Sequence, residues 1–167
     1  MPVFAGCAPP PPVCRLPSPT RTRGAQETEG LELPRDTLTE GVRAVLEGRT
    51  AAAYYLLEVP PNTGGAEAGP QGLEAREVVA QLMITFEWSD WRASNVWWIQ
   101  SVYVRPDHRR RGHFRSMYAH VRAEAAAAGA SGVRLYADTG NERAHAAYEG
   151  LGMKSHYKVF EDMFTSY

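Results

Sequence analysis

Two long apolar runs joined by a short turn constrain this 167-residue chain more than any other feature. The first run, Glu77 to Trp88, places Val78, Ala80, Leu82, Ile84 and Phe86 at alternate positions, and the second, Val96 to Val104, is rich in β-branched and aromatic residues. Both patterns predict β-strands. Residues 89–95 form the turn between them, and Pro106 ends the second strand.

The rest of the pattern alternates between helical and extended spacing. Thr37 and Glu40 have the spacing of a capping box at a helix start, and Gly48 follows the last helical turn. Residues 60–76 predict a long loop. The remaining predicted elements are a helix over 36–46, a strand over 51–59, a helix over 112–128, a strand over 133–138, a helix that Asn141 caps, and one long or two short strands over 153–164. This order predicts an α/β (α+β) domain with helices packed against a mixed sheet.

The first 26 residues differ in composition from the remainder, so we divide the chain into a tail, 1–26, and a domain, 27–167. Seven of the first nineteen residues are proline, and no acidic residue precedes Glu27. Such a segment buries too little apolar surface to offset its conformational entropy, which predicts a disordered tail. An Arg-rich organelle transit peptide is the alternative interpretation.

Composition also excludes several classes of function. The net charge is −1, which gives no general attraction to nucleic acid or to anionic lipid. The uncharged runs fall short of the roughly 20 apolar residues of a membrane helix. Cys7 and Cys14, the two cysteines, lie in the tail and have no zinc-ligand spacing, so we expect neither a disulfide fold nor a metal site. A thiol-free domain suits a reducing compartment, and we expect a cytoplasmic location unless the tail directs import into an organelle.

The first segment with clear chemistry connects the strand ending at Val104 to the helix starting near Gly112. Five of the eleven residues from Arg105 to Arg115 are arginine. Backbone N–H groups at a helix start, beside fixed cations, suit a phosphate or pyrophosphate, and glycine permits close approach. The alternatives are a solvated basic turn or a nucleic-acid patch, although a dinucleotide fingerprint and a P-loop lysine are both missing.

The second segment connects the strand over 133–138 to the helix that follows Asn141. Seven residues after Asn141 comes Tyr148, and Gly150-Leu-Gly-Met153 follows. Taken singly, Asn141 is most simply a helix cap and Tyr148 a packed aromatic.

Together the two segments resemble the GNAT superfamily of acyl-CoA-dependent N-acetyltransferases, over roughly Asp36 to Phe164. The resemblance implies a splayed, mixed sheet flanked by helices, with acetyl-CoA as the co-substrate and no metal. It implies that Asn141 contacts the pantetheine arm or the acceptor, and that Tyr148 protonates the departing thiolate. It also implies cofactor contacts from Val102, Tyr103, Val104, Arg109, Arg110, Arg111, Gly112, His113, Phe114, Arg115, Asn141 and Tyr148.

The sequence departs from the family pattern at three places. Gln100 stands where several members have a glutamate base; an amide cannot take a proton but can orient a water. Phe114 stands where glycine or alanine is common. The first strand and helix of the family have no counterpart in residues 1–26, so they are missing or replaced, or the start of the reading frame is misassigned.

The acceptor is predicted from the turn between the two long strands. Glu87 and Asp90 are the acidic residues nearest the site, and Trp88, Trp91, Trp97 and Trp98 surround them in sequence. Aromatic faces beside carboxylates suit a cation, and the region looks like that of the diamine and polyamine acetyltransferases. We therefore expect transfer to a small primary amine. The alternative for this turn is that the carboxylates are surface residues and the tryptophans pack a core and an interface, which would allow a homodimer. For the function, the alternatives are an acetyltransferase that acts on protein or peptide amines and a non-catalytic acyl-CoA-binding domain.

Overall fold

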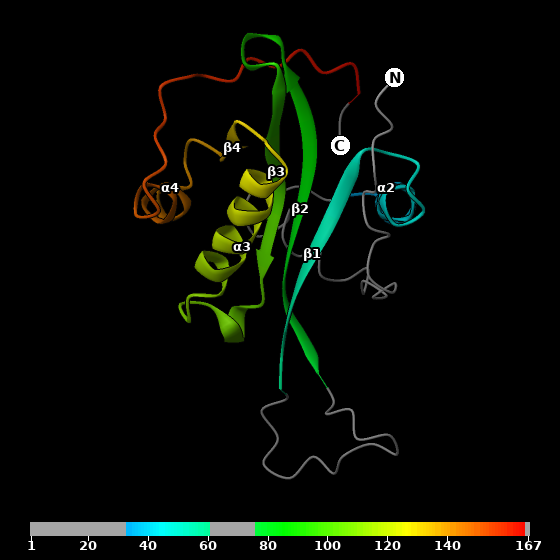
Figure 1. Ribbon diagram of the computed structural model, residues 1–167. Helices are drawn as coiled ribbons and strands as arrows, with labels where there is room; N and C mark the ends of the chain where they lie inside the picture. Colours follow the sequence, from blue (N-terminus) through cyan, green and yellow to red (C-terminus); the bar gives the residue numbers. More distant parts are fainter. Residues whose placement is uncertain (1–32, 61–75, 166–167) are drawn as a thin grey trace.

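A computed structural model describes residues 33–60 and 76–165 of the chain (Figure 1). Its centre is a four-stranded sheet in the order β1-β2-β3-β4. Strands β1, β2 and β3 are antiparallel neighbours, whereas β4 pairs with β3 in parallel. The strands are β1 Ala52–Val59, β2 Glu77–Ser89, β3 Ser94–Val104 and β4 Gly132–Leu135. The predicted class, a mixed sheet flanked by helices, is confirmed.

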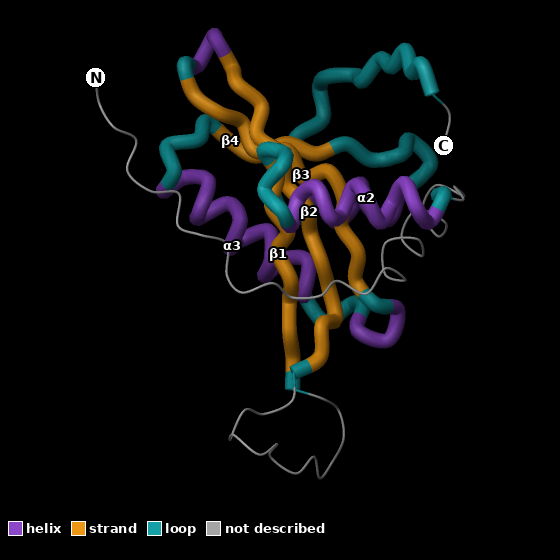
Figure 2. Tube along the Cα trace, turned by 90° about the vertical axis from the view of Figure 1, so that its right-hand side faces the viewer, coloured by secondary structure: helices purple, strands orange, loops and turns teal. Residues whose placement is uncertain are grey.

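Helices lie on both sides of this sheet (Figures 1 and 2). Helix α3, His113–Ala127, packs on one face, and α4, Glu142–Glu149, follows β4. Helix α2, Arg35–Leu46, lies on the other side of β1 from α3. Two short 3-10 helices, η1 Asp90–Arg92 and η2 Pro106–His108, follow β2 and β3 respectively.

The hydrophobic core fills the space between the sheet and α3. Helix α3 contributes Met117, Val121 and Ala125, which recur at the spacing of one helical face. The sheet contributes Ala80, Leu82, Ile84, Trp97 and Ile99, all nine-tenths or more buried. Ala80, Leu82 and Ile84, which alternate along β2, therefore face α3.

A β-bulge in β3 decides which residues face α3. Ile99 pairs with Ile84, but Ser101 pairs with Met83, so Gln100 is an extra residue without a directly opposite partner. The bulge shifts the alternation by one position, and so both Ile99 and Val102 pack against the core. It also places Gln100 at the level where β4 ends.

Three sequence predictions are corrected by the structure. Helix α2 begins at Arg35, after Pro34, so Thr37 lies inside the helix and no capping box forms. The glutamate of that motif, Glu40, instead bonds to Arg49, and Thr39 Oγ1 donates to the Arg35 carbonyl at 2.8 Å. Proline fixes φ in the range a helix start needs, which explains the earlier beginning.

The strand over 133–138 stops at Leu135, and the strand or strands predicted over 153–164 do not form. A strand requires a neighbouring ladder, and residues 153–165 have none among the described residues. Several large side chains of this C-terminal segment are exposed as a result, with Phe160 and Phe164 at 90% and 95%.

The predicted tail and most of the predicted loop lie outside the described residues. Within the described ranges, no helix is both long enough and apolar enough to cross a membrane.

Candidate active site

The site begins where β3 and β4 separate. They pair from Val96–Gly132 to Ile99–Leu135, and among the described residues β3 then continues to Val104 paired with β2 only. The edge of β3 that faces β4 thus loses its ladder partner over residues 100–104. Unpaired strand edges bind extended ligands through main-chain hydrogen bonds. Of the predicted cofactor contacts on this stretch, Val102 and Val104 are half-buried, and Tyr103 is buried.

The loop that follows β3 enters α3 without a side-chain cap. Gly112 occupies the N-cap position with φ 81°, and no side chain bonds to the first turn. The Gly112 carbonyl accepts from Ser116 N at 3.0 Å, so the N–H groups of His113, Phe114 and Arg115 lie ahead of the first intrahelical bond. Such N–H groups, at the positive end of the helix dipole, form an anion site. A Cβ at Gly112 would meet no atom within 4 Å, so the need for glycine comes from φ and not from space.

The arginines of this segment fall into two groups. Arg105 pairs with Glu77 and Asp107, and its guanidinium holds the pKa of Asp107 below the ordinary value. Arg109 turns back, donates from Nε to the Val104 carbonyl at 2.9 Å and lies 5.9 Å from the centre of the Tyr103 ring.

Arg110, Arg111 and Arg115 form the second group, and all three are exposed. Arg110 adopts φ 63°, a left-handed conformation that is uncommon outside glycine. The structure thus surrounds the uncapped helix start with three solvent-facing cations.

A buried histidine supports this loop and was not predicted from the sequence. His108 is 5% exposed, and its ring lies 5.9 Å from that of His113. In the sequence the two histidines flank Arg109 to Gly112, and this position is the only sequence signal that could have indicated their role in the loop. His108 Nδ1 and His113 Nε2 are buried with no hydrogen-bond partner among the described residues.

The second junction is closed by a side chain. Asn141 Oδ1 accepts from Ala144 N at 3.1 Å and caps α4, as predicted. The cap uses only Oδ1, so it does not involve the Nδ2 donor. The preceding turn is fixed by Asp138, whose Oδ1 accepts from Gly140 N at 2.7 Å.

Tyr148 of α4 and Phe114 of α3 bring the two junctions together. Their rings meet edge to face, with centres 5.5 Å apart. Burial raises the pKa of the Tyr148 phenol above its ordinary value near 10. The phenol is therefore protonated at neutral pH. Phe114, a departure from the family pattern, packs against Tyr148 and leaves its own backbone N–H at the helix start.

Glu87 is already engaged by two partners. One carboxylate oxygen accepts from the Trp98 indole, and the other accepts from Arg134 Nη1 at 2.9 Å. Asp90 lies three residues further on in η1, and its Oδ1 accepts from Trp91 N at 2.8 Å. The structure thus joins Glu87 to β3 and β4, whereas Asp90 remains at the tip of the hairpin.

Gln100 lies at the bulge with its carboxamide oriented by β2. Its Nε2 donates to Thr85 Oγ1 at 2.9 Å. This bond leaves the amide oxygen, a hydrogen-bond acceptor, available on the same part of β3 where β4 ends.

The four tryptophans do not form one cluster. Trp97 packs in the core against Phe86, and Trp98 faces the opposite side beside Glu87. Trp88 and Trp91 are 63% and 87% exposed near the hairpin tip. The aromatic surroundings predicted for the acceptor therefore reduce to Trp98 and its neighbour Tyr136, whose rings lie 6.1 Å apart.

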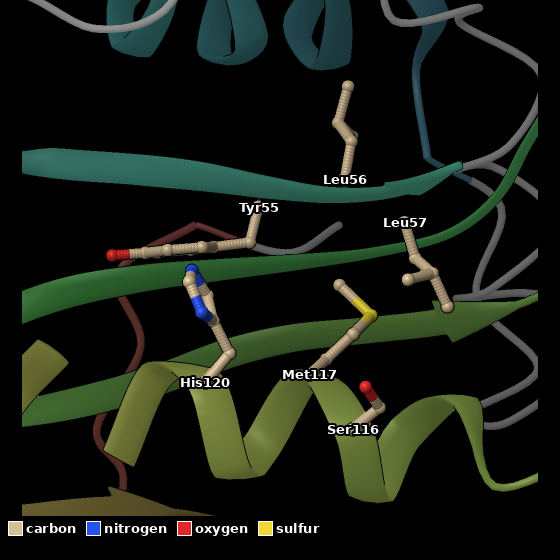
Figure 3. Close-up of a pocket in the computed structure, with 6 residues that line it drawn as sticks. All are labelled: Tyr55, Leu56, Leu57, Ser116, Met117 and His120. Atoms are coloured by element: carbon tan, nitrogen blue, oxygen red, sulfur yellow. The ribbon is translucent and has the colours of Figure 1, made fainter. Parts of the chain in front are cut away.

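A pocket of about 280 Å³ lies elsewhere, between β1 and α3 (Figure 3). Tyr55 and Leu57 line it from β1, while Ser116, Met117 and His120 line it from α3. Its polar rim is internally paired, because Tyr55 Oη donates to Glu124 and His120 Nε2 lies 3.2 Å from the same carboxylate. It belongs to the β1 edge of the sheet and not to the separation of β3 and β4. Among the described residues, no group of three or more His, Cys, Asp or Glu side chains could hold a metal ion.

The comparisons with known proteins agree with this geometry. Residues 45–153 match the model of the acetyltransferase (GNAT) family. A protein of Clostridium difficile 630, described as a possible acetyltransferase, is 34% identical, with 89% of this chain and 90% of that chain covered and a TM-score of 0.70. The chain belongs to the acetyltransferase (GNAT) family, whose members use acetyl-CoA.

More distant structures share the fold. A ribosomal-protein-alanine N-acetyltransferase from Brucella melitensis biovar Abortus 2308 is 18% identical over 88% of this chain and 89% of that chain, with a TM-score of 0.63. An aminoglycoside acetyltransferase from an uncultured soil metagenomic sample is 27% identical over 56% of this chain and 62% of its own, with a TM-score of 0.50. No curated protein matches the chain significantly in sequence.

Proposed function

We propose that this protein transfers an acetyl group from acetyl-CoA to a primary amine, and that the acceptor is a small cationic amine. The observation that carries the proposal is that β3 extends beyond the end of β4 and leads into a helix start that has no side-chain cap and is flanked by arginines. One end of this arrangement suits a pyrophosphate and the other suits an extended amide-bearing arm. Acetyl-CoA supplies the activated acyl group when it is bound.

Each part of the cofactor would meet a different set of residues. The N–H groups of His113, Phe114 and Arg115 would hold the pyrophosphate, with Arg110 and Arg111 adding charge. The edge of β3 that β4 leaves uncovered, from Gln100 to Tyr103, would pair with the pantetheine amides, whereas the Val104 carbonyl already accepts from Arg109 Nε. Asn141 can donate from Nδ2 without losing its cap, because the cap uses Oδ1.

Tyr148 is the general acid of the proposal. It supplies a proton to the sulfur of the leaving group, and a raised pKa keeps that proton in place throughout the neutral range. Its contact with Phe114 holds the ring at the start of α3, beside the proposed cofactor loop.

The acceptor must lose a proton before it can attack. An alkyl amine with a pKa near 10.4 is neutral in only about one molecule in 10³ at pH 7. The amide oxygen of Gln100 can accept a hydrogen bond from the amine or from a water that carries its proton away. Of the two carboxylates, Glu87 lies beside this position but is held by Arg134 and Trp98, so it serves better to orient than to remove a proton.

Two of the related structures support an amine acceptor through their descriptions, one as an aminoglycoside acetyltransferase and one as a ribosomal-protein-alanine N-acetyltransferase. The test is an amine panel with acetyl-CoA, followed by thiol release, that includes diamines, polyamines, free lysine, aromatic amines and short peptides. Turnover of small aliphatic amines is the expected result. Tight acetyl-CoA binding with no turnover would indicate a non-catalytic acyl-CoA-binding domain. Higher turnover of short peptides than of small amines would overturn the small-amine acceptor.

We propose also that the protein forms a homodimer and acts in the cytoplasm. Large apolar side chains at the hairpin tip and in the C-terminal segment are exposed, and exposed apolar patches commonly mark an interface. The cytoplasmic location rests on the two cysteines, which both lie in the first 26 residues. Light scattering of the full chain tests the dimer, and imaging of a C-terminal fusion tests the location.

A further inference from the structure

A charged and aromatic group on the sheet has no role in the cofactor site described above. It consists of Glu87, Trp98, Arg134 and Tyr136. Val133 and Leu135 pack against the core, so Arg134 between them points to the opposite face of the sheet from α3. Trp98 is the cross-strand partner of Arg134 and lies between Trp97 and Ile99, both of the core, so it shares this face.

The group stands at the point where β3 and β4 separate. Arg134 is one residue before Leu135, the last residue of β4 that pairs with β3. An acceptor whose amine is bound at the separation would therefore have the rest of the molecule close to Arg134.

The chemistry of the group favours an anion over a second cation. Both oxygens of Glu87 are taken, one by Trp98 and one by Arg134, and its charge is balanced by the guanidinium. Arg134 uses only Nη1 in this pair, so among the described residues its other N–H groups have no bonded partner. Its side chain is 37% exposed. A guanidinium with donors to spare binds a carboxylate in a fixed geometry.

The aromatic neighbours define the rest of the ligand. The rings of Trp98 and Tyr136 lie 6.1 Å apart at a tilt of 55°. They offer apolar surface beside the guanidinium, which suits a short aliphatic stem between the two charged groups. The ion pair of Glu87 and Arg134 has no net charge. The selectivity for a carboxylate would therefore come from the directed N–H groups of Arg134 and not from long-range attraction.

We propose that Arg134 is a specificity-determining residue that binds a carboxylate of the acceptor, so that the preferred acceptor is a small molecule with both a primary amine and a carboxylate. This inference rests on the proposed function, since it concerns the acceptor of the same transfer. It refines the cationic acceptor expected from the sequence, because the charge of Glu87 is already balanced by Arg134.

The experiment compares acceptors in matched pairs that differ only in the carboxylate. Lysine is paired with 1,5-diaminopentane and leucine with 3-methylbutylamine, with acetyl-CoA saturating and thiol release as the readout. We expect kcat/KM to be at least about tenfold higher for the amino acid of each pair, the value of one charge-assisted hydrogen-bonded contact. Raising the salt concentration should change this ratio little, because exposed long-range charge is screened and a directed contact is not.

The variants test the residue itself. Arg134→Gln should bring the ratio close to one, and Arg134→Lys should leave it intermediate, because lysine keeps the charge but loses the planar fork. Glu87→Gln should raise kcat/KM for the amino acid of each pair by releasing Arg134, and it should leave kcat/KM for the decarboxylated amine unchanged. A selective loss of diamine turnover in Glu87→Gln would show that Glu87 receives a cation and would overturn the carboxylate site. The double variant Glu87→Gln with Arg134→Gln leaves no unpaired charge and controls for folding. Arg122→Gln, an exposed arginine on the far half of α3, should leave the ratio unchanged.

The outcomes separate this inference from the proposed function. If the two acceptors of each pair have equal kcat/KM, or if the decarboxylated amine has the higher value, the carboxylate site is overturned. The proposed N-acetyltransferase activity would stand in both cases. A ratio that Arg134→Gln does not change would do the same. No turnover of any amine, despite acetyl-CoA binding, would overturn the proposed function.

Discussion

The two helix starts beside the site are built in opposite ways. Helix α4 begins with Asn141, whose side chain occupies the Ala144 N–H at 3.1 Å. Helix α3 begins with Gly112, which has no side chain to offer and adopts φ 81°. An occupied helix start is a structural cap, worth about 1 kcal/mol of stability. An open one keeps its N–H groups for a ligand.

This difference assigns separate tasks to the two junctions. The α3 junction exposes N–H groups and three arginines, which suit the anion binding proposed for it. The α4 junction has its own side-chain cap and positions a half-buried phenol, Tyr148. The proposed pyrophosphate binding at α3 and the proposed proton transfer by Tyr148 therefore depend on different residues, which separate variants can test.

The largest expected effect is on catalysis at the α4 junction. Tyr148→Phe removes one hydroxyl and keeps the ring that packs on Phe114. We expect kcat to fall by about 10²-fold, with the KM for acetyl-CoA little changed, because a general acid acts on the transition state. Steady-state kinetics at saturating acceptor measures both constants.

The pH dependence gives a second readout of the same group. The acid must be protonated, and burial raises its pKa, so the kcat of the wild type should decline only above pH 10. That alkaline decline should disappear in Tyr148→Phe. Tyr118→Phe is the control, because Tyr118 also neighbours Phe114, with ring centres 6.3 Å apart, but belongs to α3. An unchanged kcat in Tyr148→Phe would reduce the residue to a packing role.

The next effect concerns binding at the α3 junction. Arg110→Gln with Arg111→Gln removes two exposed cations and keeps the backbone donors. We expect the KM for acetyl-CoA to rise about tenfold at low salt and less at high salt, because exposed charges are screened. Arg122→Gln removes one cation outside the loop and should leave KM unchanged. A fall in kcat with KM constant would contradict the separation of the two junctions.

A smaller effect concerns the backbone of the loop. Gly112→Ala places a Cβ at φ 81°, which costs about 1–2 kcal/mol although the space around it is open. Denaturant unfolding measures this loss. Gly132→Ala is the matched control, since Gly132 is also surrounded by open space but has no positive φ. Equal stability of Gly112→Ala and Gly132→Ala would show that the loop relaxes without penalty.

What the sequence could predict depended on how local the cause was. The basic loop between β3 and the uncapped start of α3 was predictable because Pro106 ends a strand, Gly112 opens a helix and the arginines lie between them. The bulge at Gln100 was not, because it is defined by the register between β2 and β3. The same holds for the bond between Arg134 and Glu87, residues 47 apart, which requires the parallel pairing of β3 with β4.

The C-terminal segment shows that local composition can also predict an element that does not form. Its residues have β-forming composition, but Tyr157, Val159 and Phe160 remain exposed because composition does not supply a neighbouring strand. The capping box failed for a related reason. Glu40 had the correct spacing to return to the helix start, but Arg49 lies close in space and binds it.

The smallest expected effect separates the two roles of Asn141. Asn141→Ala removes the acceptor of the Ala144 N–H, and we expect a loss of about 1 kcal/mol in the free energy of unfolding. Asn141→Asp keeps an acceptor for the cap but replaces the Nδ2 donor that would face the cofactor, so it should restore stability and not the KM for acetyl-CoA. Asn95→Ala, at an exposed position of β3, is the stability control. If Asn141→Asp restores both quantities, the side chain is a cap alone and the α4 junction takes no part in binding.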